Sequence, residues 1–409
     1  MRHLDAAVSE IEQELITFTQ DLVRIRSYTG EEEEVIRFIK ERMEQLGFEE
    51  IRIDSMGNLL GRIGNGPVTL LFDSHVDTVE VNDAEQWSVP PFSGAIRDGR
   101  LYGRGSVDMK SSVAATLYGA VLAHRLGWGE GVTVLVSCTV MEEDCDGENL
   151  RHLFEEFELR PDYVVICEPS DNVITLGHKG KAQIVIRTRG VAAHGSAPEK
   201  GRNAVYEMAE ITRRVETTNA NLADAGKPGS SRGTLVLSRI SSTAESLNAV
   251  PYDCEIYLDR RTVPGETNET VQKEMERIVA GKEAEWAPGT LKRRSWTGLS
   301  VVYEPMHPPW RIAEDAPLTR ACAAAHRAAL GSEPERYEFW DFSTNAVTPV
   351  ALGIPTIGFG PGEYKLAHTR DESCRVDRIV EACSFYAHLV RVLADTSDTS
   401  DTSDTLNTR

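Results

Sequence analysis

Several acidic and histidine side chains stand where apolar runs of this chain end, and such side chains can bind divalent metals. His75 follows the run VTLLFDS, and Glu168 closes the run PDYVVIC. Open α/β sheets bind their ligands beyond the carboxyl ends of their strands, so we expect these side chains to gather at one edge. Imidazole and carboxylate ligands suit zinc, with cobalt or manganese as replacements. The pattern predicts a metal-dependent hydrolase with a pair of metals. The candidate residues, in chain order, are His75, Asp77, Asp108, Glu142, Glu143, Glu168 and His368.

The adjacent pair Glu142 and Glu143 closes the apolar run GVTVLVSCTVM. Neighbouring side chains at a strand end point in opposite directions, so one carboxylate can bind metal while the other stays free. A free carboxylate beside a metal-bound water is what a general base requires. The segment MEEDCDGE is equally typical of a solvated acidic turn.

Other candidates also allow simpler interpretations when they are taken singly. The spacing of His75 and Asp77 puts both side chains on one face, where Asp77 could orient the histidine or bind metal itself. The same H-x-D pattern is common at ordinary strand ends. Asp108 precedes the helical stretch MKSSVAATLYGAVLAHRL and could be its N-cap. Only the combination of these residues at the ends of one sheet favours a metal site.

The elements that position these residues are typical of an α/β protein. Strands near 68–73, 132–140 and 162–167 alternate with helices near 109–126 and 147–157. This alternation predicts a mostly parallel sheet with helices on both faces. Before it, the sequence predicts helices at 3–27 and 31–46, the second ending at Gly47, and a hairpin that turns at Met56-Gly57-Asn58.

A second module interrupts the sheet pattern. After Gly177 the order is β-α-β-β-α-β, a ferredoxin-like arrangement. Its predicted strands are KAQIVIRTR, GTLVLSRI, DCEIYLDRR and TLKRRSW, with helices near 203–219 and 266–283. We therefore expect a discontinuous catalytic domain over 1–177 and 301–394, with an inserted domain over 178–300 hinged near 177–181 and 297–302. The polar repeat at 395–409 is predicted to be disordered.

Composition narrows the class of protein. The chain has 409 residues and a net charge of −20, which disfavours binding to nucleic acid or acidic membranes. There is no apolar stretch long enough for a membrane span, and the N-terminal sequence lacks a signal-peptide pattern. Seven scattered cysteines fit a reducing compartment, so we expect a cytoplasmic protein.

The ordered motifs of this chain resemble the M20 family of metallopeptidases and deacylases, which includes acetylornithine deacetylase, succinyl-diaminopimelate desuccinylase and carboxypeptidase G2. The similarity runs from residue 75 to 373, in family order. The matching segments are SHVDTV, GRGSVDMK, TVMEEDCDG, ICEPS, GVAAHGSAPEKGRNA, LNAVP, DCEIYLDRR, GFGPG and AHTRDES.

The resemblance implies a role for each matching residue. One metal is expected on His75, Asp108 and Glu168, and the other on Asp108, Glu143 and His368, so that Asp108 bridges two ions, most simply zinc. Glu142 would be the general base and Asp77 would orient His75. The inserted domain would be a lid that forms a homodimer and brings His194 to the partner's site. Arg261 and Asn248 would bind a small-molecule substrate, Arg261 through a carboxylate.

The segment FWDFSTNA, with the paired arginines of DCEIYLDRR, resembles a branch of hydrolases linked to selenium metabolism. Trp340, Phe342, Ser343 and Asn345 could line the substrate pocket, although Trp340 and Phe342 could equally be core residues, and we favour the core for Trp340. We expect hydrolysis of an N-acyl or N-carbamoyl amino acid or a dipeptide. The alternatives are a hydrolytic deaminase of a small amine and a non-catalytic metal-binding scaffold, against which the intact Glu142 argues.

Overall fold

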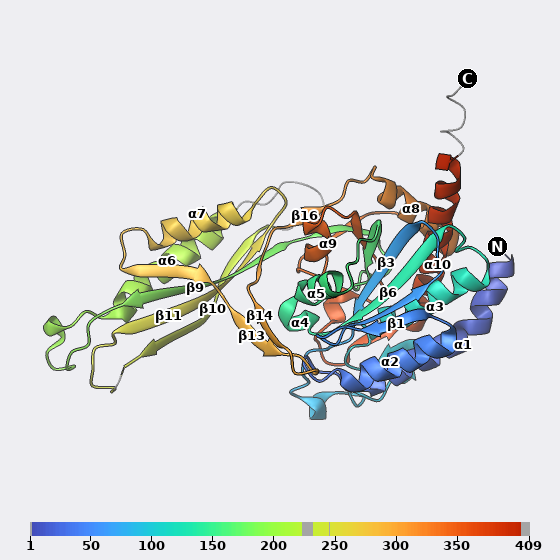
Figure 1. Cartoon of the computed structure of the whole chain (residues 1–409). Coiled ribbons are helices and arrows are strands. Elements are labelled where there is room, and N and C mark those ends of the chain that lie inside the picture. The colour runs from blue at the N-terminus through green and yellow to red at the C-terminus, as the bar shows by residue number, and fades with distance from the viewer. Residues whose placement is uncertain (1, 223–231, 245, 402–409) are drawn as a thin grey trace, which may run out of the picture.

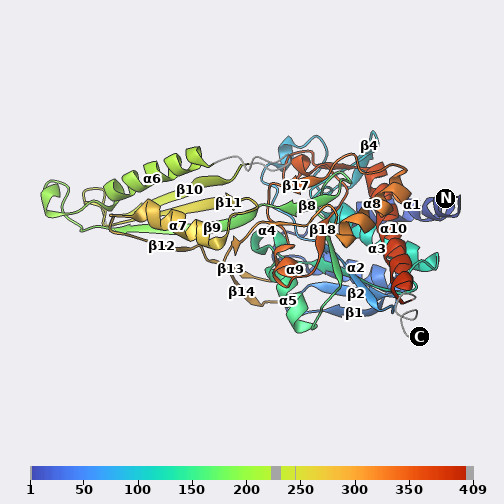
Figure 2. The same ribbon diagram turned by 90° about the horizontal axis from the view of Figure 1, so that it is seen from above.

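The structure of this chain is a computed structural model that describes residues 2–222, 232–244 and 246–401. The chain forms a larger part, built on a long sheet, and a smaller part that projects from it (Figures 1 and 2). Both termini lie on the larger part (Figure 1). Among the helices that the structure describes, none is long and apolar enough to cross a membrane.

A nine-stranded sheet forms the centre of the larger part, and it is mostly parallel, as predicted. The four strands β6, β3, β7 and β18 are parallel neighbours, whereas β2 and β8 pair with them antiparallel. In path order the strands are β1 (Glu49–Ile53), β2 (Leu59–Ile63), β6 (Val132–Thr139), β3 (Val68–His75), β7 (Tyr163–Ile166), β18 (Thr356–Gly358), β8 (Thr175–His178) and β16 (Trp310–Arg311), and β17 (Glu338–Trp340) pairs with β8.

Helices cover both faces of this sheet because its strands bury both sets of alternating side chains. Leu70 and Phe72 of β3 join the main core, while Leu71 joins a second core with Leu150 and Phe154 of α5. The helices are α1 (Arg2–Arg24), α2 (Glu33–Leu46), α3 (Lys110–Arg125), α4 (Glu142–Cys145), α5 (Glu148–Glu156), α8 (Pro317–Leu330), α9 (Val347–Ala351) and α10 (Val376–Asp401).

Two glycines explain local features of these helices. Gly47 adopts a left-handed conformation, with φ of 86°, at the end of α2, as the sequence predicts. Gly119 lets α3 pack closely against α10, because a Cβ there would lie 2.8 Å from the Cβ of Tyr386. Helix α3 is buried along most of its length, and this fixes the loop that precedes it.

The smaller part is the predicted ferredoxin-like module. Its sheet has the order β10 (Thr234–Thr243), β11 (Asp253–Thr262), β9 (Gly180–Arg189) and β12 (Ala284–Pro288), with antiparallel neighbours throughout. Helices α6 (Ala204–Asn221) and α7 (Asn268–Val279) cover one face (Figures 1 and 2). Strand β11 alternates strictly between buried and half-buried residues, which matches its apolar alternation.

Three predicted boundaries of the fold are wrong. The last strand of the module is β12, because TLKRRSW instead forms β13 (Leu291–Arg294), which pairs with β14 (Ser300–Tyr303). The chain then adds β15 (Met306–His307) to β9 and returns to the large sheet only at β16. Helix α10 continues to Asp401, so residues 395–401 are helical rather than disordered. The rest of the predicted tail, 402–409, lies outside the described residues.

Candidate metal centre

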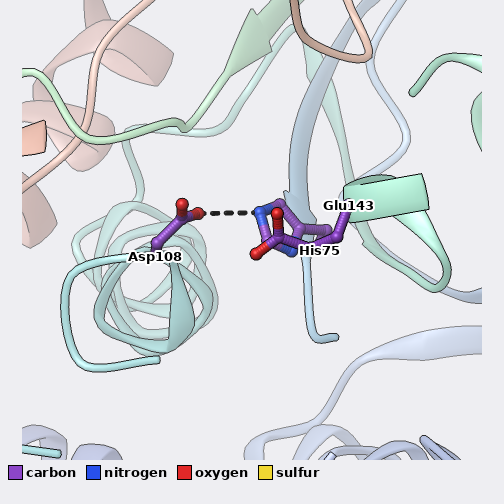
Figure 3. Close-up of side chains that lie close together, drawn as sticks. All are labelled: His75, Asp108 and Glu143. Carbon is purple, nitrogen blue, oxygen red and sulfur yellow. Dashed lines mark hydrogen bonds and ion pairs between the residues drawn. The ribbon is translucent and has the colours of Figure 1, made fainter. Parts of the chain in front are cut away.

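His75 is the last residue of β3, and its ring is held by the residue two positions further on. Its Nδ1 lies 3.0 Å from the backbone oxygen of Asp77, so Nδ1 donates and Nε2 is left to face the site. Nε2 lies 2.9 Å from Oδ1 of Asp108, which follows the glycine-containing turn before α3 (Figure 3). The structure therefore places Asp77 behind the histidine and Asp108 in front of it.

Asp108 stands between two histidines. Its Oδ1 faces His75, and its Oδ2 lies 3.2 Å from Nε2 of His368. The same His368 nitrogen is 3.0 Å from Oε1 of Glu143, and His75 Nε2 is 3.7 Å from Oε1 of Glu168. The five predicted ligands thus form two groups that share Asp108. Asp108 is not the N-cap of α3, because Met109 occupies that position.

Glu142 and Glu143 diverge, but not for the reason that the sequence suggested. They open the short helix α4 after Met141, whose φ of 59° is left-handed, rather than ending a strand. The Asp77 carboxylate accepts hydrogen bonds from the backbone N–H groups of Glu142 (3.0 Å) and Glu143 (3.2 Å). Glu142 Oε2 then lies 4.0 Å from Nε2 of His75, while Glu143 reaches His368.

Burial and mutual repulsion dominate the electrostatics of this cluster. Burial raises the pKa of Glu142 and of Glu168 well above the usual range, and nearby carboxylates raise both further. The carboxylates of Asp108 and Glu143, which accept hydrogen bonds from the His368 ring, raise the pKa of His368 to about 10. Buried carboxylates at this density are costly without cations, so the donor set fits two divalent metals. A mixture of imidazole and carboxylate ligands is also what zinc prefers.

A cavity of about 280 Å³ opens beside the cluster. Most of its wall comes from the larger part, but Lys181 of β9 and Arg261 of β11 come from the smaller part. The predicted Arg261 and Ser343 therefore both reach the cavity, and so does Phe342. Its lining residues are Asp108, Glu142, Glu143, Asp146, Glu168, Pro169, Lys181, Arg261, Phe342, Ser343, Tyr364, Ala367 and His368.

Asn345 does not reach the cavity, so its predicted role in substrate binding is wrong for this arrangement. Its amide nitrogen donates to the buried carboxylate of Asp73 at 2.8 Å and to Thr139 at 3.1 Å. Its amide oxygen accepts from the N–H of Gly147. The Asn345 side chain therefore provides a hydrogen-bond partner for the buried carboxylate of Asp73. Trp340 is a buried core residue, as favoured from the sequence, and its indole N–H donates to the backbone oxygen of Pro169.

His194 and Asn248 lie together on the smaller part, away from the cavity of their own chain. His194 forms an isolated β-bridge with Ala249, and the N–H of Gly195 donates to the backbone oxygen of Asn248 at 2.6 Å. Both side chains are exposed. This position is compatible with the expected contribution of His194 to a partner's site, and that contribution stays a prediction.

Sequence reasoning missed the residue that fixes the Asp108 loop. Glu372 is fully buried, and its Oε1 accepts from the backbone N–H groups of Val107 (2.9 Å) and Asp108 (3.2 Å). Its Oε2 accepts from Arg104 at 2.5 Å. The one signal was an acid four residues after His368 in AHTRDES, a segment otherwise typical of an exposed loop. Lys181 and Asp146 were missed as well.

Comparison with known proteins finds similarity over most of the chain. Residues 71–392 match the model of "Peptidase family M20/M25/M40". The chain is 36% identical to the uncharacterized protein YgeY of Escherichia coli (strain K12) over 381 residues, which covers 92% of this chain and 94% of that protein. It is 29% identical to acetylornithine deacetylase of Aliivibrio fischeri over 345 residues, covering 83% and 86%. The solved structure of the Bacillus subtilis YxeP protein, a dinuclear metal binding peptidase from the M20 family, superposes with a TM-score of 0.69 at 16% identity and covers 95% of this chain and 99% of its own.

Proposed function

Because this chain belongs to peptidase family M20/M25/M40, whose members hydrolyse C–N bonds, we propose that it uses two divalent metals to cleave the amide bond of a small N-acyl or N-carbamoyl amino acid or a dipeptide. One observation carries the proposal. The two oxygens of Asp108 face one histidine each, and each histidine has a glutamate beside it. A carboxylate in that position can bridge two ions.

The proposed roles follow from the positions of the side chains. His75, Asp108 and Glu168 would hold one ion, and Asp108, Glu143 and His368 the other. When bound, two such ions acidify a water and polarise the substrate carbonyl. Glu142 accepts the proton from the attacking water and delivers it to the nitrogen that leaves as the C–N bond breaks.

The cavity supports a small substrate with a carboxylate. Its volume of about 280 Å³ is near the lower end for ligand pockets, which favours an amino acid derivative over a long peptide. The guanidinium of Arg261 donates to Asp259 through Nε and Nη2 and keeps Nη1 for a substrate carboxylate. Ser343 and Phe342 lie in the same wall and would contact the rest of the substrate.

We propose a homodimer formed through the smaller part, with His194 acting in the partner's site. Strand β10 is an edge of its sheet, and apolar side chains on and near it are exposed, including Val236, Ile240 and Leu247. An exposed apolar edge strand is a common pairing surface. We also propose a cytoplasmic location, because all seven cysteines are buried free thiols.

The test of the proposed function is metal analysis of the purified protein combined with a substrate panel. We expect about two metals per chain. Glu142→Gln should keep the metals and lose turnover by about 10²- to 10⁴-fold. Asp144→Asn is the matched control, because Asp144 lies in the same helix and pairs with Arg293 outside the cavity. Full activity of Glu142→Gln would remove the mechanism. Turnover of aryl amines alone would favour the deaminase, and two metals without any turnover would favour the scaffold.

The dimer has a separate test. If His194 acts in the partner's site, mixing inactive His194→Ala with inactive Glu142→Gln regenerates one complete site in each mixed dimer. About a quarter of wild-type activity should return after subunit exchange, since half of the dimers are mixed and each carries one intact site. Absence of recovery, with exchange verified by tagged subunits, would place His194 outside the reaction.

A further inference from the structure

Two basic side chains that face the cavity stand directly opposite each other in the small sheet. Lys181 of β9 and Arg261 of β11 are register partners in the antiparallel pair. Opposite residues project from the same face with Cβ atoms about 5 Å apart, and like charges in that arrangement are destabilising. Both nevertheless line the cavity, and Lys181 is largely buried. A pair of cations held this close suits a shared anionic ligand.

The local contacts leave part of each cation free to bind. The Lys181 ammonium donates to Oδ1 of Asp146 at 2.8 Å, and this is its single hydrogen bond among the described residues. An ammonium has three N–H donors, so further donors remain. Arg261 uses Nε and Nη2 on the carboxylate of Asp259, at 2.7 and 3.2 Å, which leaves Nη1.

Asp146 lines the cavity and fixes the position of the lysine ammonium. Its Oδ1 also accepts from the hydroxyl of Tyr303, whose oxygen lies 2.9 Å from Nε2 of His307. His307 is the register partner of Lys181 on the other side, in β15. Asp146, in turn, follows α4, the helix that carries Glu142. The ion pair therefore sets the position of the ammonium relative to the catalytic glutamate.

We propose that Lys181 is a specificity-determining residue that binds the substrate carboxylate together with Arg261, so that the enzyme selects amides that carry a free carboxylate and discriminates against their neutral carboxamides. The inference rests on the proposed function and adds Lys181 to Arg261 as a second cation that binds the substrate carboxylate. The guanidinium and the ammonium each donate to the anion, and charge-assisted hydrogen bonds of this kind are among the strongest in proteins. Away from these two cations and Asp146, the cavity wall carries four carboxylates, those of Asp108, Glu142, Glu143 and Glu168, which would repel an anion.

The test compares matched substrates, an N-acyl amino acid and its carboxamide, with metal-loaded wild-type enzyme and Lys181→Met. The specificity ratio is kcat/KM for the acid divided by kcat/KM for the carboxamide. We expect Lys181→Met to lower this ratio by about 10- to 100-fold. The fall should come from kcat/KM for the acid, while kcat/KM for the carboxamide stays unchanged. Lys179→Met is the control: Lys179 is also buried and pairs with Asp341, but it does not line the cavity, so the ratio should stay unchanged.

A second variant separates selectivity from misfolding. Lys181→Met leaves Asp146 unpaired, whereas Lys181→Met with Asp146→Asn removes both charges and should show the same loss of ratio with a normal unfolding midpoint. Equal losses on both substrates, or an unchanged ratio, would overturn the inference. If the wild type cleaves neither compound, the proposed function fails, and calorimetric binding of the same acid and carboxamide to wild type and variants decides the role of Lys181 independently.

Discussion

The position of Asp108, the proposed bridging ligand, depends on a carboxylate that does not line the cavity. Glu372 precedes β19 (Ser373–Arg375), which pairs with β5 (Arg100–Tyr102), and β5 in turn pairs with β4 (Ala95–Arg97). From that small sheet Glu372 reaches into the loop of Asp108 and binds two backbone N–H groups and Arg104. Burial raises its pKa to about 7, although Arg104 opposes the rise, so it is ionised at pH 8.

We predict that Glu372→Gln destabilises the protein and weakens metal binding. The amide oxygen of glutamine can still accept from the N–H groups of Val107 and Asp108. The amide nitrogen would then face the Arg104 guanidinium, and both groups are hydrogen-bond donors. The buried positive charge of Arg104 would therefore lose its partner. Breaking a buried ion pair by removing one partner costs about 3–5 kcal/mol. Displacement of a group that orients a metal ligand typically weakens metal affinity about 10- to 100-fold.

The assay is urea unfolding at pH 8 with and without metal, together with competitive metal titration. Glu363→Gln is the matched control, because Glu363 pairs with Arg100 at 3.4 Å in a partly exposed position, where an ion pair is worth about 1 kcal/mol or less. Unchanged metal affinity in Glu372→Gln would refute the proposed dependence of Asp108 on Glu372. Loss of stability with normal affinity would show that Glu372 supports the fold alone.

Three further outcomes are expected. Asp77→Asn should weaken metal binding by about 10- to 100-fold, measured by competition with a chromophoric chelator, because its amide would oppose the N–H of Glu142 or Glu143. Compared with protein in free metal at 100 times its Kd, removal of the metal by a chelator should lower the free energy of unfolding by about 2.7 kcal/mol and so lower the unfolding midpoint. An unchanged midpoint would show that metal binding does not stabilise the fold. Burial lowers the pKa of His178 to about 4, below the unfolded value, so its contribution to stability is present above pH 6.5 and is lost as the pH falls toward 4. His178→Phe should flatten the pH dependence of unfolding in that window.

The large sheet and the cluster of candidate metal ligands could be predicted from the sequence because both depend largely on local patterns. Apolar runs of strand length end in acids or histidines, and parallel strands bring those ends to one edge. That reasoning selected the five candidate ligands that the structure brings together, although Asp108, Glu143 and His368 lie in loops or in the short helix α4 rather than at strand ends. It failed for the last strand of the small sheet, where Ala284–Pro288 and Leu291–Arg294 both have strand character. Which of them pairs with β9 depends on tertiary packing.

The roles of polar side chains near the site were harder to predict because they depend on long-range contacts. Asn345 looked like a pocket residue, but it binds Asp73, which is distant in the sequence and buried under the site. Glu372 looked like a loop acid, but it is buried against Arg104. A buried acid within an apolar strand, such as Asp73, must have a polar partner. The sequence shows that need without showing which residue meets it.

The cavity wall combines residues from both parts of the chain, and this division bears on how its substrate is selected. The proposed metal ligands belong to the large sheet and its adjoining loops, whereas Lys181 and Arg261 belong to the inserted module. Lys181 lies just after the first crossover between the two parts, and Tyr303 and His307 lie on the second. A shift of the module would therefore move both cations relative to Glu142 while leaving the metal ligands in place. Substrate choice can then vary through the module without disturbing the metals, and correct placement of a carboxylate can favour the arrangement in which Glu142 acts.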